Sequence, residues 1–216
     1  MTTFRAISLI ASNLAIVLAP TQWSAAQDAV RHLPQRAATG LYDDPAAHIW
    51  GPNSSITAAD GPHECTHEVQ SELRQVWMKA YGGQWNAVYV LRDKAFMIRE
   101  PPVTLRQVAA AVPQAERGKV YDLYLVRQAA AWSESLYLLD EWAAYLNGLE
   151  CDLATDHPHN SIPWQAECCR EFARYADTLV RVVRAQAPQY DTTQLAAVIA
   201  YQSRRTAELS AREPKP

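Results

Sequence analysis

Two histidines four residues apart, His63 and His67, constrain the fold of this chain more than any other feature. They begin and end a His-Glu-x-x-His sequence in which Glu64 is the acid. Residues at i and i+4 lie one above the other on a helix, whereas on a strand they would be about 13 Å apart. Gly61 and Pro62 precede them, and Pro suits the first turn of a helix. The sequence therefore predicts a helix from Gly61 that carries both imidazoles on one face.

The apolar positions that follow extend this helix. Val69, Leu73 and Trp77 recur at helical spacing, so the helix is expected to continue to about Ala80. Residues 86–99 then favour β structure around a polar turn at residues 92–94, which predicts a β-hairpin.

The spacing of the two histidines suits a metal ion. Imidazoles of His63 and His67 can hold one cation, and Glu64, one step round the helix, can reach a water on it. This division between ligands, water and base is the signature that a zinc hydrolase needs. The alternative is an ordinary helix start, with Glu64 in a partial capping box and both histidines as plain polar residues.

A second segment, residues 135–148, reads as a strongly apolar helix that contains Asp140 and Glu141. Carboxylates among Leu, Trp and Ala are costly to bury unless they are paired or bind a metal. Glu141 is therefore a candidate third ligand from a second helix. Tyr145, four residues on, shares its face and is a candidate hydroxyl donor to negative charge that develops during catalysis. The alternative is that Asp140 or Glu141 pairs with an arginine or faces solvent.

These residues resemble the zincin-type metallopeptidases, in the arrangement of the gluzincin branch. The resemblance implies a Zn²⁺ cofactor held by His63, His67 and Glu141, with Glu64 as the general base and a peptide or protein as substrate. Glu141 is the weaker match, because its interval from the motif is not diagnostic. The resemblance covers the motif helix and, loosely, the Glu141 helix. Pro62 before the first histidine and Glu68 after the second depart from the family pattern.

The first 26 residues have the features of a secretory signal peptide. Arg5 is followed by an apolar stretch from Ala6 to Ala19, and residues 24–26 are small enough for cleavage. The apolar stretch is short for a membrane span. We therefore expect an exported protein, secreted or periplasmic. Residues 27–60 then read as an irregular N-terminal arm, and residues 61–216 as one mostly helical domain.

Export would place the four cysteines in an oxidising compartment, where disulfides form. Cys168 and Cys169 are adjacent and poorly suited to bond each other. We expect one of them to pair with Cys151 and the other with Cys65. A thiolate metal site is disfavoured because no Cys-x-x-Cys spacing occurs.

The remaining sequence predicts further helices and therefore a mainly α (α+β) fold, zincin-like and disulfide-stabilised, with a small hairpin. The helices are expected at residues 104–111, 119–132, 136–152 and 161–187 and after Asp191. His157 and His159, in the loop before residue 161, are alternative ligands. The net charge of −3 without a basic tract excludes nucleic acid as a partner, and no segment beyond residues 1–26 suggests a membrane.

The function expected from these features is a zinc-dependent hydrolase, most simply a metallopeptidase. The alternative is a non-catalytic, exported helical module that binds a partner, a degenerate zincin, and Pro62 favours it. No feature of the sequence indicates an oligomeric state.

Overall fold

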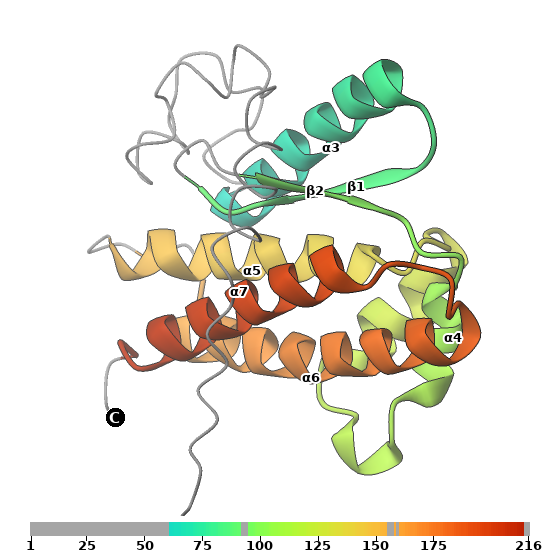
Figure 1. Cartoon of the computed structure of the whole chain (residues 1–216). Helices are drawn as coiled ribbons and strands as arrows, with labels where there is room; N and C mark the ends of the chain where they lie inside the picture. Colours follow the sequence, from blue (N-terminus) through green and yellow to red (C-terminus); the bar gives the residue numbers. More distant parts are fainter. Residues whose placement is uncertain (1–60, 92–94, 155–157, 159, 214–216) are drawn as a thin grey trace, which may run out of the picture.

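The computed structural model describes residues 61–91, 95–154, 158 and 160–213. These residues form a mainly helical fold with one two-stranded antiparallel sheet, which confirms the predicted fold class at this level (Figure 1). The main elements are α3 (Gly61–Tyr81), β1 (Trp85–Tyr89), β2 (Ala95–Arg99), α4 (Leu105–Ala111), α5 (Tyr137–Leu153), α6 (Ile162–Gln186) and α7 (Thr193–Ser210).

Helix α5 is the centre of the fold. Helix α3 and the hairpin lie along one side of it, and α6 and α7 lie along the other (Figure 1). Leu139, Trp142 and Leu146 of α5 pack with Phe172 of α6 and Val198 of α7 in the main hydrophobic core. Each such side chain stabilises the fold by roughly 1.5–3 kcal/mol when it is fully buried. A helix buried on most of its surface explains the apolar composition of residues 136–149.

The hairpin closes a smaller core against α3. Val69 and Leu73 of α3 pack with Tyr89 of β1 and Met97 of β2. The two strands pair in antiparallel register, so the predicted hairpin is confirmed, and its turn at residues 92–94 lies outside the described residues. This packing fixes α3 relative to α5, because β1 contacts both helices.

The hairpin is also tied to the helices by side chains along both strands. The Tyr89 N–H of β1 donates to Gln70 Oε1 at 3.0 Å. On β2, the Met97 carbonyl accepts from Gln194 Nε2 at 2.7 Å, and the Arg99 carbonyl accepts from the Tyr190 hydroxyl at 2.6 Å. These bonds satisfy backbone groups that an edge strand otherwise leaves unpaired.

The segment at residues 119–132 differs from the regular helix that its sequence predicts. It forms a π-helical stretch, η3 (Tyr121–Arg127), followed by a 3₁₀ turn, η4 (Gln128–Ala130). Its start is held by α6, because the buried Glu171 carboxylate accepts from the backbone N–H groups of Lys119 and Val120 at 2.8 and 3.1 Å. A Cβ at Gly118 would lie 2.2 Å from this carboxylate, so any other residue there would displace the Glu171 side chain. Tertiary contacts therefore override the local helical preference.

The disulfide prediction was wrong. All four cysteines lie within the described residues, and none of them is joined in a disulfide. Cys168 and Cys169 are neighbours on α6, so their side chains point about 100° apart. The Cys168 thiol forms a hydrogen bond with the Tyr145 hydroxyl of α5. Burial raises the pKa of the Cys169 thiol, and the charge of Arg205 on α7 opposes this shift. Burial raises the pKa of the Cys168 thiol to about 12, so it packs as a protonated, apolar side chain.

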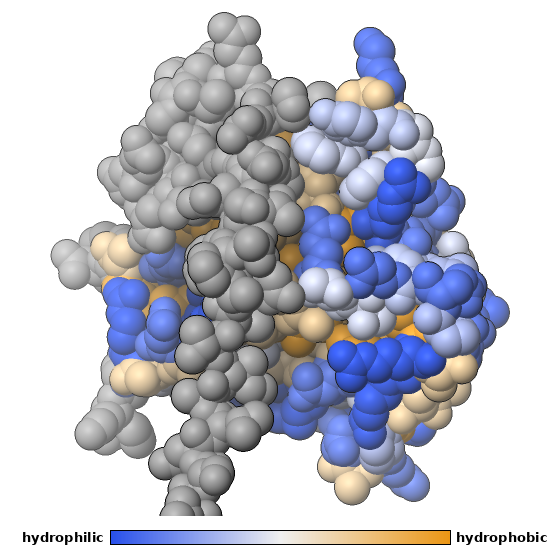
Figure 2. Space-filling view, in the orientation of Figure 1, coloured by the Kyte–Doolittle hydropathy of each residue, from blue (hydrophilic) through white to orange (hydrophobic). Residues whose placement is uncertain are grey.

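The described part of the surface is mostly hydrophilic on the face shown in Figure 2, with smaller hydrophobic areas between. Within the described residues, no helix combines the length and the apolar character that a membrane span requires. The predicted signal peptide (1–26) and arm (27–60) lie outside the described residues, as do His157 and His159.

Candidate metal centre

Helix α3 presents the two motif histidines side by side. It begins at Gly61, as the sequence predicts, and one helical turn separates His63 from His67. Their Nε2 atoms lie 3.2 Å apart. Gly148 of α5 lies opposite His63, with an ideal Cβ 3.9 Å from His63 Cβ, and the close approach at this glycine is to Gln165 Oε1 of α6, at 2.7 Å.

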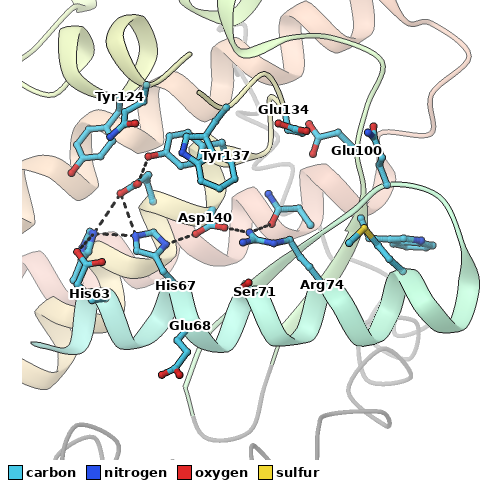
Figure 3. Close-up of a pocket in the computed structure, with 18 residues that line it drawn as sticks. His63, His67, Glu68, Ser71, Arg74, Glu100, Tyr124, Glu134, Tyr137 and Asp140 are labelled. Carbon is cyan, nitrogen blue, oxygen red and sulfur yellow. Dashed lines mark hydrogen bonds and ion pairs between the residues drawn. The ribbon is translucent and has the colours of Figure 1, made fainter. Parts of the chain in front are cut away.

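Helix α5 brings Glu141 to the same point. Its Oε2 lies 3.5 Å from His63 Nε2 and 3.6 Å from His67 Nε2, and all three candidate ligand atoms lie within 4.8 Å of one another (Figure 3). The Glu141 side chain is only 6% exposed. The structure therefore brings together the three residues that the sequence suggests as metal ligands.

The spacing of these atoms fits a tetrahedral ion. A zinc ion with bonds of about 2.0–2.1 Å and tetrahedral angles separates its ligand atoms by about 3.3–3.4 Å. The three observed separations are 3.2, 3.5 and 3.6 Å. Glu141 Oε2 is also buried, and among the described residues it has ion-pair contacts with both imidazoles but no hydrogen bond, so a bound cation would give it a direct partner. Two imidazoles and one carboxylate are a donor set that zinc accepts, with a fourth position left for water.

Asp140 orients His67 from behind. Its Oδ1 lies 2.6 Å from His67 Nδ1, so an N–H at Nδ1 leaves Nε2 free to bind a metal. Asp140 also accepts from Gln70 Nε2 at 2.6 Å and from the Arg74 guanidinium. Pairing of Asp140 with an arginine is the alternative weighed from the sequence, and it occurs together with the contact to His67.

The electrostatics of the cluster favour a positive charge. Burial alone would lower the pKa of His67, but the hydrogen bond to Asp140 and the nearby charges of Asp140 and Glu141 outweigh it and raise this pKa to about 10. Burial alone would raise the pKa of Glu141, but its contacts with the two histidines hold it at about 2. The carboxylates thus stabilise a cation at this position, whether a proton on His67 or a metal ion.

Glu64 lies at the solvent side of the cluster. Its side chain is 59% exposed, and its Oε1 lies 3.9 Å from His63 Nε2. It is therefore beside the candidate metal position without being one of the three converging ligands. A carboxylate in this position can contact a solvent molecule beside the histidines.

Three tyrosines surround the ligands, and they differ in how they contact the site and the cavity. Tyr145 packs edge-on against His63, with ring centroids 4.6 Å apart, and it is not among the described residues that line the cavity. Its hydroxyl lies 2.8 Å from that of Tyr124, which does line the cavity. Tyr137, also on the wall, donates its hydroxyl to Glu141 Oε1. Tyr145 therefore contacts the site indirectly, through the packing of its ring on His63 and the contact of its hydroxyl with Tyr124.

The cluster forms one end of a cavity of about 710 Å³. Helix α3, the start of β1, η3 and the start of α5 contribute to its wall. Glu68, one of the departures from the zincin pattern, lies on this wall, and the other, Pro62, lies in the first turn of α3. Neither residue prevents the three ligands from converging.

Sequence reasoning missed two of the supporting side chains. Tyr137 precedes Glu141 by one helical turn, so the same i, i+4 argument that selected Tyr145 would also have found it. Tyr124 comes from an irregular segment, and its position beside the cluster depends on how η3 packs against α5 and α6.

Comparison with known proteins finds no family model, no curated protein and no solved structure that matches this chain.

Proposed function

We propose that this protein is a zinc-dependent hydrolase in which His63, His67 and Glu141 hold the metal. The observation that carries the proposal is the triangle of ligand atoms 3.2, 3.5 and 3.6 Å apart, closed by a buried carboxylate oxygen without a hydrogen-bond partner. A zinc ion bound there would supply a Lewis acid that activates water and polarises a carbonyl near neutral pH.

The residues around the ligands suit the hydrolysis of a peptide bond. Glu64 takes a proton from the attacking water as the new C–O bond forms, and it returns that proton to the amine as the C–N bond breaks. Tyr124 donates its hydroxyl to the carbonyl oxygen as this oxygen gains charge. Burial raises the pKa of Tyr124 to about 12, so the hydroxyl keeps its proton for this role. Asp140 and Tyr137 hold His67 and Glu141 in place.

A polypeptide is the substrate class that this proposal favours. The cavity is long enough to extend from the histidines past Arg74 to Met78 and Trp85, so it can hold more than a single small group. The proposal includes two further points. The zincin-like architecture is inferred from the His-Glu-x-x-His motif, and export is inferred from the signal-like residues 1–26.

The proposal is tested by replacing Glu64 with Gln. We expect Glu64→Gln to bind as much zinc as the parent but to hydrolyse peptides about a thousandfold more slowly, because the amide cannot accept the proton. The measurement is mass-spectrometric counting of new N-termini in a complex peptide mixture, with and without a zinc chelator. Glu72→Gln, on the same helix but off the cavity wall, is the matched control and should retain the parent rate.

Two results would contradict the proposal. Full activity in Glu64→Gln would remove Glu64 from the reaction. Chelator-insensitive cleavage, or none by a zinc-loaded parent protein, would favour the alternative of a non-catalytic module that binds a partner.

A further inference from the structure

The cavity continues from the metal ligands to an aromatic stack. Trp132 lies parallel to Tyr137, with ring centroids 5.6 Å apart and planes inclined by 4°. Tyr137 is the residue that donates to Glu141, so the stack is linked directly to a candidate ligand. Trp132 lines the cavity and is 48% exposed. An indole held in place by a ring on one face, yet open to the cavity, offers a surface for a substrate side chain.

Two carboxylates lie next to this stack. Glu134 follows Trp132 by two residues, and Glu100 lies beside Glu134 on the cavity wall (Figure 3). Burial, together with the nearby charge of Glu134, raises the pKa of Glu100 to about 7, although Leu136 N–H and the Ser135 hydroxyl stabilise its charged form. The two like charges therefore lie close enough to repel each other, and a cation between them would relieve this repulsion.

The wall of the cavity supplies no such cation. Among the described residues that line it, Arg74 is the one lysine or arginine. Its guanidinium already donates to Asp140 and to Asn86 Oδ1. A cationic group on a bound molecule would therefore meet no competing lysine or arginine from the described wall at Glu100 and Glu134.

We propose that Trp132, Glu134 and Glu100 form a specificity subsite for a lysine or arginine side chain of the polypeptide substrate. The inference rests on the proposed hydrolase function and adds its substrate class. The cationic head group binds between the carboxylates through charge-assisted hydrogen bonds, and the aliphatic stem or guanidinium plane lies on the indole. Acidic side chains are rejected by the same carboxylates.

The test uses binding, so that it does not depend on turnover. The protein is Glu64→Gln, both zinc-loaded and metal-free. The probes are two fluorescein-labelled dodecapeptides of Ala, Gly and Ser with one central residue, either arginine or its uncharged isostere citrulline. We expect the arginine peptide to bind about tenfold more tightly, as a charge-assisted contact together with a cation–π contact provides.

The variants assign this preference to its residues. Glu134→Gln and Trp132→Leu, each added to Glu64→Gln, should reduce the arginine preference to about twofold or less. Glu208→Gln removes the same charge from α7, and Trp164→Leu removes another exposed indole; both should keep the full preference. Equal affinities for the two peptides, the absence of binding, or an arginine preference that survives Glu134→Gln would each overturn the subsite.

Failure of the subsite and failure of the hydrolase are separate results. A zinc-loaded protein that cleaves peptides without discriminating arginine from citrulline retains the function and loses the subsite. A protein that binds no zinc but still prefers the arginine peptide retains the subsite and loses the hydrolase.

Discussion

Asp140 connects the candidate metal ligands to the rest of the fold. It contacts His67 Nδ1 on one side and Gln70 and Arg74 on the other, all of them on α3. Because this contact sets which nitrogen of His67 carries the proton, the amide in Asp140→Asn should weaken zinc binding about 10- to 100-fold. Competition with a chromophoric chelator measures this affinity. The exposed Asp177→Asn on α6 is the control, and an unchanged zinc affinity in Asp140→Asn would show that Asp140 does not support the site.

The hydroxyl of Tyr124 is the one we expect to act on the reacting carbonyl. Tyr124→Phe should lower kcat about a hundredfold at unchanged zinc content, since it removes a donor to developing negative charge. Tyr145→Phe should cause a smaller loss, because Tyr145 acts through its 2.8 Å contact with Tyr124. Steady-state kinetics on one cleaved peptide measures both, with Tyr201→Phe on α7 as control. A larger loss in Tyr145→Phe than in Tyr124→Phe would reverse the two assignments.

Single residues were predictable where helical spacing alone determines their position. His63 and His67 follow from i, i+4 geometry, and Glu141 follows from the cost of a carboxylate within an apolar helix. The neighbours that complete the site depend on contacts between helices. Tyr124 is distant in sequence from both ligand helices, so no local pattern connects it to His63.

The start of α5 depends on a side chain from outside the helix. Glu100 accepts from the Leu136 N–H at 2.9 Å and from the Ser135 hydroxyl at 3.0 Å. Glu100 follows the hairpin, so this contact joins the hairpin to α5. The acceptor satisfies a backbone donor that the helix itself leaves unpaired.

This contact predicts a pH-dependent stability. The pKa of Glu100 rises from 4.5 to about 7 on folding, mainly through burial. The folded state therefore binds more protons between these values, and the stability contributed by Glu100 falls as pH rises from about 4.5 through 7. Relative to Glu100→Gln, the parent should lose on the order of 3 kcal/mol of unfolding free energy over this range.

Urea unfolding at a series of pH values measures that difference. The variant keeps an oxygen to accept from Leu136 but cannot ionise, so the unfolding free energy of the parent should fall relative to that of the variant as pH rises. Glu208→Gln, at an exposed position on α7, should show a constant gap. A parent whose unfolding free energy stays constant or rises relative to that of Glu100→Gln as pH increases would contradict this prediction.

Elements with strong local signals were predicted well. The Thr104 capping box begins α4, and α6 begins directly after Ser161, as their sequences indicate. The segment at residues 119–132 was not predicted correctly, because Glu171 of α6 accepts hydrogen bonds from its backbone at Lys119 and Val120. Local propensity describes an element that stands by itself, whereas this segment takes its shape from a neighbour.

On the scale of the whole molecule, the fold class was predictable from the sequence, but the way the helices pack against one another was not. Helical periodicity and one hairpin predict a mainly α fold, but the packing of α3 across α5 depends on contacts between elements, such as those from Asn147 Nδ2 to Thr66 Oγ1 and to the Tyr89 carbonyl. The disulfide prediction failed because it rested on the inferred compartment and on the number of cysteines. In the fold, Cys168 and Cys169 are both buried without a disulfide, and burial favours their protonated thiols.

The central claim is that two helices meet around one metal ion, and the zinc content of purified variants tests it most directly. After equilibration with zinc and removal of the excess, the parent protein should retain close to one zinc ion per chain, measured by inductively coupled plasma mass spectrometry. His67→Ala and Glu141→Ala should each retain almost none, while Glu64→Gln retains as much as the parent. Equal zinc content in Glu141→Ala and the parent, or no zinc in the folded parent, would contradict the account.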